Sequence, residues 1–181
     1  KTLEKRAPSD EFRDDLESLG DATSAIVEQV SNLSHRLHPA VLKELGLEAA
    51  LRTLVQEMLA EAELDFDYHL DLGGQRLTSE IEISLYRIAQ ESLTNIVRHA
   101  KAEHVSVEIQ VTSNNVSLYI KDDGRGFMSD NLGHKASRDH LGLISMQERA
   151  EMIGGSLAVE ATPGSGTSIN VRIPIQLKET E

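Results

Sequence analysis

The chain has 181 residues, of which 39% are hydrophobic and 27% charged, and its formal net charge is -12 at pH 7. This length suits one domain with an additional segment, or two small domains. The absence of Cys excludes disulfides and thiolate metal sites. The acidic charge argues against a nucleic-acid or acidic-membrane surface, because phosphate groups favour Lys and Arg. No apolar run reaches membrane length, so we expect a cytoplasmic segment without membrane contact.

The first part of the chain has a regular apolar period. Its apolar positions are separated alternately by four and three residues, a repeat of about 3.5 that is typical of helix-bundle or coiled-coil packing. We predict one long helix that pairs with another helix and ends at Pro39. The alternative is a single amphipathic helix that lies on its own domain. The positions are Phe12, Leu16, Leu19, Thr23, Ile26, Val30, Leu33 and Leu37.

The middle of the chain predicts a helix, a strand and a second helix. Residues 47–59 place apolar side chains on one face of a helix that follows a glycine. Residues 64–70 alternate between apolar and polar side chains, as in a half-buried strand. Ser79 and Glu82 have the spacing of a capping box, which predicts that a helix begins there and runs to about His99.

The second half of the chain predicts two hairpins with a helix between them. Residues 104–111 and 116–122 alternate on either side of a TSNN turn, and residues 156–161 and 167–175 flank the turn TPGSG. Residues 141–153 form a predicted helix that ends at a glycine pair. Hairpin strands interspersed with helices predict an α+β fold, a two-layer α/β sandwich with one mixed sheet and helices on one face.

Polar residues repeat along the helix that is predicted to end at His99. Glu91, Asn95, Arg98 and His99 are spaced by four and by three or four residues, so they share one stripe of a regular helix. An acid, an amide and a cation on one stripe also form an ordinary solvated helix face, because polar pairs at this spacing are common on exposed helices. They become a candidate site only together with the segments that follow.

Three glycine-containing segments follow this helix. In DDGRGF, Asp122 ends a strand, and its carboxylate is suited to accept a hydrogen bond from an exocyclic amine while the glycines let a flat ring approach. Gly142 opens a helix, where free N–H groups favour an anion. In PGSGT, Thr167 adds a hydroxyl near the same place. Each segment taken alone is also explained by a structural turn, a plain helix start or a simple hairpin.

Taken in order, these segments resemble the ATP-binding domain of bacterial sensor histidine kinases. The resemblance is carried by QESLTNIVRHA, DDGRGF, HLGLISMQERAEMIGG and PGSGT, and LSHRLHPAVLKELGLEAAL is similar to the subfamily of nitrate, desiccation and oxygen sensors. It implies the ATP-binding fold shared with gyrase-type and chaperone ATPases. It also implies two domains, residues 1–38 as part of a dimerisation and phosphotransfer helix and residues 39–181 as the ATP-binding catalytic domain.

The resemblance also implies roles for single residues. Asp122 would accept the adenine amino group with support from Thr167, and Asn95 would ligate Mg²⁺, which prefers oxygen donors. Glu91 would act as the catalytic base or hold a metal-bound water, and residues 128–140 would form a lid over ATP. Further nucleotide contacts are implied for Arg98, His99, Gly124, Gly126, Gly142, Leu143, Gly164 and Gly166.

The implied function is transfer of the γ-phosphoryl group of Mg-ATP to a histidine on the upstream dimerisation helix, for relay to a response regulator in a two-component system. The intact protein is expected to be a homodimer. None of the 7 His residues is followed by an acid, as the family's phosphoacceptor is, so we expect the acceptor to lie on another segment. The alternatives are a serine kinase of the anti-sigma-factor type and a non-catalytic nucleotide-sensing dimerisation module.

Overall fold

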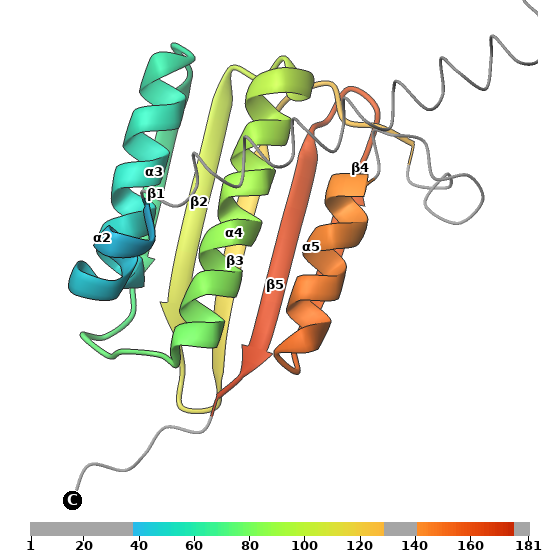
Figure 1. Cartoon of the computed structure of the whole chain (residues 1–181). Helices are drawn as coiled ribbons and strands as arrows, with labels where there is room; N and C mark the ends of the chain where they lie inside the picture. Colours follow the sequence, from blue (N-terminus) through green and yellow to red (C-terminus); the bar gives the residue numbers. More distant parts are fainter. Residues whose placement is uncertain (1–37, 129–140, 176–181) are drawn as a thin grey trace, which may run out of the picture. The chain divides into compact units, whose positions relative to one another are not determined.

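The structure is a computed structural model that describes residues 38–128 and 141–175 (Figure 1). The chain divides into two compact units, Lys1–Ala40 and Val41–Glu181, and nearly all described residues belong to the second. The predicted heptad helix, and the predicted lid apart from its first residue, lie outside the described residues. In the two described ranges, no helix is both long and apolar enough to cross a membrane.

Five strands form one mixed sheet in the order β1-β2-β3-β5-β4 (Figure 1). β1 runs parallel to β2, and the remaining neighbours are antiparallel. Both predicted hairpins are confirmed: one joins β2 to β3 and the other joins β4 to β5. In addition, β5 pairs with β3. The strands are β1 (Asp65–Asp71), β2 (His104–Val111), β3 (Asn115–Asp122), β4 (Ser156–Ala161) and β5 (Thr167–Pro174).

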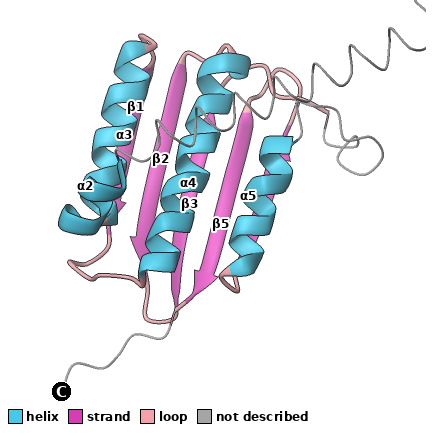
Figure 2. Ribbon diagram, in the orientation of Figure 1, coloured by secondary structure: helices cyan, strands magenta, loops and turns pink. Residues whose placement is uncertain are grey.

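The helices cover one face of this sheet (Figure 2), which confirms the predicted two-layer α/β sandwich. α3 packs on β1, α4 on β3, and α5 on β4 and β5. The helical segments are α2 (His38–Leu45), α3 (Leu47–Glu61), α4 (Ser79–Asn95), the π-helix η1 (Ile96–Ala100) and α5 (Leu141–Met152).

The core lies between the helices and one face of the sheet because the strands alternate. In β2, Val105, Val107 and Ile109 are fully buried, whereas Glu108 and Gln110 are exposed. Burying one such aliphatic side chain stabilises the fold by about 1.5–3 kcal/mol relative to leaving it in water. A shift of the strand by one residue would reverse this arrangement, so the pattern sets the register.

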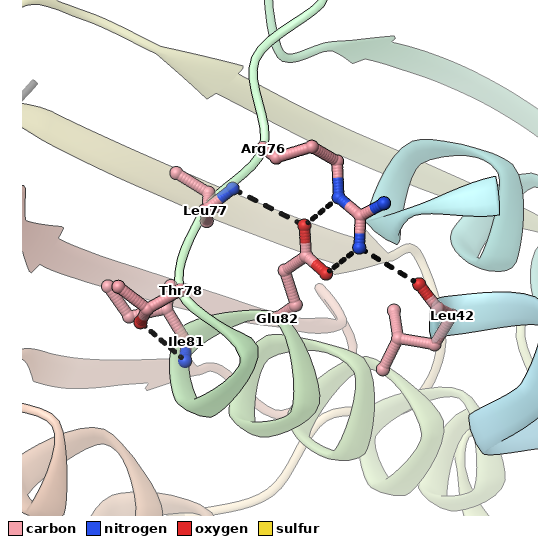
Figure 3. Close-up of polar contacts among 6 residues, drawn as sticks. All are labelled: Leu42, Arg76, Leu77, Thr78, Ile81 and Glu82. Atoms are coloured by element: carbon pink, nitrogen blue, oxygen red, sulfur yellow. Dashed lines mark hydrogen bonds and ion pairs between the residues drawn. The ribbon is translucent and has the colours of Figure 1, made fainter. Parts of the chain in front are cut away.

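The start of α4 differs from the predicted capping box. The N-cap is Thr78, whose Oγ1 accepts a hydrogen bond of 3.4 Å from the amide of Ile81, and the helix begins at Ser79 (Figure 3). The carboxylate of Glu82 is instead paired with the guanidinium of Arg76. The prediction of Ser79 as the cap was therefore wrong by one residue. The residue three positions after Thr78 is Ile81, which has no carboxylate, and the Glu82 carboxylate binds Arg76 and the amide of Leu77 instead of the amide of Ser79.

Replacing Thr78 by Ala is expected to destabilise the domain by roughly 0.5–2 kcal/mol, because one helical N–H group loses its acceptor. Urea unfolding followed by circular dichroism measures this difference. Ser79→Ala, at the next position, is the matched control and should change stability by less than about 0.5 kcal/mol. A larger loss for Ser79→Ala than for Thr78→Ala would return the capping role to Ser79.

The helix that was predicted to reach His99 changes its type near its end. α4 ends at Asn95, and Ile96–Ala100 forms a π-turn that stops at Lys101 in the left-handed conformation, with φ of 53°. Bonds from residue i to i+5 widen this turn, which is common at functional sites. The stripe predicted from a uniform 3.6-residue period therefore does not continue through Arg98.

The segment around Pro39 also differs from its prediction. Residues 38–45 form α2, a short helix that was not predicted. The predicted end of the heptad helix at Pro39 stays a prediction, because residues 1–37 lie outside the described residues. Proline is tolerated in a first helical turn because its missing N–H group would have no partner there. The predicted helix after Gly46 is confirmed as α3, with Gly46 as its N-cap at φ of 87°.

Candidate functional site

A cavity of about 400 Å³ opens where α4, η1 and α5 meet the sheet ends of β3 and β5. It gathers residues from segments that are far apart in the chain. Six of the predicted site residues lie in its wall, namely Asn95, His99, Asp122, Gly126, Leu143 and Thr167. The other lining residues are Ser92, Ile96, Ala100, Ile120, Arg125, Phe127, Met128 and Ile169.

Asp122 is the buried acid of this cavity, with 3% of its surface exposed. Its Oδ1 accepts a hydrogen bond of 2.9 Å from the amide of Gly124. Burial raises the pKa of the Asp122 carboxyl, and hydrogen bonds from the backbone amides of Gly124 and Thr167 offset part of that rise. A carboxylate held in this way by backbone groups has a fixed orientation toward a ligand.

The neighbouring acid, Asp123, has a different task. Its Oδ1 accepts hydrogen bonds from the amides of His104 (2.9 Å) and Glu103 (2.8 Å), and these bonds lower the pKa of Asp123. Asp123 therefore ties the end of β3 to the start of β2 and does not line the cavity. The two adjacent carboxylates of DDGRGF thus separate into one that faces the cavity and one that holds the backbone.

The glycines of DDGRGF and PGSGT let two turns pack backbone against backbone. A Cβ atom on Gly126 would meet the carbonyl oxygen of Thr162, and a Cβ atom on Gly166 would meet the carbonyl oxygen of Asp122. Gly126 and Gly166 also have φ values of 56° and 84°, which L side chains rarely adopt. The absence of a side chain at Gly166 lets its backbone lie against that of Asp122, and the absence of one at Gly126 lets its backbone lie against that of Thr162.

Gly124 and Gly164 lie close to two other backbone groups, those of Ala100 and Arg125. A Cβ atom on Gly124 would meet the carbonyl oxygen of Ala100, the last residue of η1, which also accepts the amide of Arg125 at 2.8 Å. The amide of Gly164 donates to the carbonyl of Arg125 at 2.7 Å. Neither glycine lines the cavity, so their predicted contact with the nucleotide remains a prediction.

Asn95 at the end of α4 and His99 on η1 lie in the cavity wall, whereas Arg98 does not. Arg98 is exposed on the π-turn. Glu91 does not line the cavity, yet it lies beside it, because a Cβ atom on Gly142 would collide with its Oε1 and would come within 3.5 Å of the Asn95 Nδ2. Glu91, Asn95 and the start of α5 are thus close together, as the sequence analysis expected of one site.

Apolar residues form much of the wall and were missed by the sequence reasoning. Ile120 and Ile169 face each other across β3 and β5, and Asp122 and Thr167 form the next such pair on the same face. The two-residue period of a strand was the signal available, because Ile120 and Ile169 each lie two residues from a predicted site residue. Ile96, Phe127 and Met128 complete the apolar part.

These residues fit an adenine nucleotide with Mg²⁺. Apolar side chains suit a flat ring, and the Asp122 carboxylate accepts from an exocyclic amine. Within residues 38–128 and 141–175, no group of three or more acidic or His side chains would hold a metal alone. The side-chain oxygen of Asn95, in the cavity wall, is a donor of the kind that Mg²⁺ prefers, and Mg²⁺ in proteins commonly completes its coordination with phosphate and water oxygens.

Fold and site together define the class of protein. Residues 80–177 match the family of histidine kinase-, DNA gyrase B- and HSP90-like ATPases, and the chain belongs to this family. Within it, the chain is 32% identical over 173 residues to the oxygen sensor histidine kinase NreB of Staphylococcus carnosus (strain TM300), covering 96% of this chain and 49% of that protein. The resemblance to oxygen-sensing histidine kinases is thereby confirmed.

Further similarities point the same way. The chain is 31% identical over 142 residues to the signal transduction histidine-protein kinase/phosphatase DegS of Bacillus subtilis (strain 168), covering 77% of this chain and 37% of that protein. It therefore spans less than half the length of NreB and of this DegS.

Solved structures share the fold. The blue-light activated histidine kinase EL346 of Erythrobacter litoralis superposes with a TM-score of 0.64 at 20% identity, covering 93% of this chain and 64% of that one. The histidine kinase AdeS of Acinetobacter baumannii gives a TM-score of 0.58 at 16% identity, covering 94% and 87%.

Proposed function

We propose that this chain binds Mg-ATP and delivers its γ-phosphoryl group to a histidine, as the catalytic part of a two-component sensor histidine kinase. The observation that carries the proposal is the buried, backbone-held carboxylate of Asp122 in a largely apolar cavity whose wall also contains Asn95. Phosphoryl transfer depends on positioning and on neutralising charge more than on covalent help from the protein. A cavity of this kind supplies the positioning.

Each residue has a distinct role in this proposal. Bound Mg-ATP supplies the phosphoryl group and the cation that neutralises it. Asp122 orients the base, and the Asn95 side-chain oxygen holds the metal. Glu91, beside Asn95 and Gly142, takes a proton from the acceptor or orders a water. Further contacts to the phosphates come from Arg98, His99, Gly142 and Leu143.

The acceptor and the partners follow from the same proposal. The acceptor is a histidine on the dimerisation helix of the same kinase, and the phosphoryl group then passes to a response regulator. The names of NreB and DegS as histidine kinases support this choice over a serine kinase or a non-catalytic nucleotide sensor.

The first test is binding of ATP with Mg²⁺ by the chain. A ligand at 100 times its dissociation constant stabilises the native state by about 2.7 kcal/mol, which a thermal-shift assay detects as a clear rise in Tm. We expect the Asn95→Ala variant to bind Mg²⁺ at least about tenfold more weakly, because changes around a metal's ligands typically cost 10- to 100-fold in affinity. Titration of ATP at several Mg²⁺ concentrations measures this loss.

Transfer is measured with labelled ATP and a fragment that carries an acceptor histidine followed by an acid. Labelling of that fragment, and a weaker signal with Asn95→Ala, is the expected result. No thermal shift with ATP in the presence of Mg²⁺ would refute the nucleotide site. An Asn95→Ala variant with unchanged dependence on Mg²⁺ would remove the metal role of Asn95.

A further inference from the structure

Glu82 is a buried acid that the nucleotide site does not use. It lies in the first turn of α4, and only 3% of its side chain is exposed. Both carboxylate oxygens are bound to Arg76, Oε1 to Nε at 2.8 Å and Oε2 to Nη2 at 2.9 Å, and Oε1 also accepts the amide of Leu77 at 3.3 Å (Figure 3). A two-point pair of this kind fixes the direction of the guanidinium.

The guanidinium that Glu82 holds reaches a different part of the fold. Nη2 of Arg76 also donates to the carbonyl oxygen of Leu42 in α2, at 3.4 Å (Figure 3). The same carbonyl accepts the amide of Gly46 at 3.1 Å, so it marks the corner between α2 and α3. Arg76 also lies against Gly46, because a Cβ atom there would be 3.3 Å from its Cδ.

Through Arg76, these contacts connect α2 with α4. α2 follows residues 1–37 directly in the chain, and α4 carries Asn95 at its far end. At 1.5 Å per residue, Glu82 and Asn95 are about 20 Å apart along α4. A change at Glu82 therefore leaves the nucleotide contacts themselves intact.

We propose that Arg76 and Glu82 form a clamp that holds the α2–α3 corner on the first turn of α4. The helix leading into the ATP-binding unit and the helix that carries Asn95 then move as one body. Without the clamp, the corner keeps the packing of apolar side chains such as Val41, Leu42 and Leu47 but loses its polar contacts to Arg76, and α2 opens more readily than the sheet. This inference does not depend on the proposed function, because it concerns contacts away from the cavity.

Hydrogen–deuterium exchange of the full chain tests the clamp. The main variant is the double substitution Arg76→Met with Glu82→Met. In this pair the Glu82 side chain is 3% exposed and that of Arg76 is 53% exposed, so replacing both partners leaves no unpaired charge in the buried position of Glu82. We expect amides 42–46 to exchange about tenfold faster, the order of effect of losing hydrogen bonds to a charged group. Amides of β2 and β3 should keep their wild-type rates.

Two further variants complete the experiment. Glu82→Gln keeps the shape of the side chain but removes its charge, so it should speed exchange at amides 42–46 to a smaller extent than the double variant. If the double variant does not fold, Glu82→Gln is the variant that tests the clamp. Glu48→Gln removes the exposed pair with Arg52 on α3 and should leave these amides unchanged.

Unchanged exchange at amides 42–46 in the foldable variants would overturn the clamp. An equal acceleration in β2 and β3 would also overturn it, because the pair would then contribute only to global stability. ATP binding is measured on the same samples. If the wild type does not bind ATP, the proposed function fails while the exchange result still decides the clamp.

Discussion

Replacing Asp122 by Asn is expected to weaken ATP binding by roughly 10- to 100-fold, the effect of losing a hydrogen bond to a charged group. An amide offers a single oxygen and presents an NH₂ donor where the adenine amino group is also a donor. Isothermal titration with ATP at constant Mg²⁺ measures the loss. Equal affinities for the variant and the wild type would refute Asp122 as the adenine contact.

The dependence of this binding on pH gives a second measurement. Because burial raises the pKa of Asp122, its carboxylate is protonated at a higher pH than that of an exposed aspartate as the pH falls. Wild-type affinity for ATP should fall with this protonation, and Asp122→Asn should lack this part of the pH dependence. Asp123→Asn is the matched control, because Asp123 holds backbone amides outside the cavity and should change ATP affinity by less than about twofold.

Replacing Gly166 by Ala is expected to destabilise the domain more than the other substitutions described above, by roughly 2–5 kcal/mol, because the strained φ and the crowding of the backbone both contribute. The added Cβ atom meets the carbonyl oxygen of Asp122, and the φ of 84° disfavours any L side chain. Moving this carbonyl also displaces the carboxylate, so ATP affinity should fall in the fraction that remains folded. Urea unfolding and ATP titration measure the two effects.

Gly164 provides the control in the same turn. Its φ is 79°, but a Cβ atom there would meet nothing within 4 Å. In urea unfolding, Gly164→Ala should therefore lose only the free energy of the conformational strain, about 1–2 kcal/mol. If both variants lost the same stability, the contact between Gly166 and Asp122 would have no energetic importance.

Parts of this protein follow from residues that are close together in the chain. Strict alternation on both sides of TSNN predicts the hairpin of β2 and β3, and the apolar face after Gly46 predicts α3. These signals are local, because a strand period or a tight turn is encoded in the residues that form it. The segment DDGRGF likewise indicated Asp122 as a candidate site residue. The resemblance to histidine kinases then suggested ATP as the ligand.

Local patterns failed where a distant residue competes for the same group. Ser79 and Glu82 satisfy the capping-box spacing, yet the carboxylate of Glu82 pairs with Arg76, since a buried charge needs a charged partner. The uniform period of α4 also predicted one regular helix through Arg98 and His99, whereas the structure has a π-helix at Ile96–Ala100; the role of Arg98 in the site stays a prediction.

The cavity itself was decided only by the tertiary structure. β5 pairs with β3, so Asp122 stands opposite Thr167 and Ile120 opposite Ile169. This pairing depends on how well all five strands and their helices pack together, and no short stretch of sequence contains that information. Sequence alone therefore proposed Asp122, Gly126 and Asn95 as candidate site residues, and all three line the cavity, while the order of strands in the sheet decided which side chains surround them.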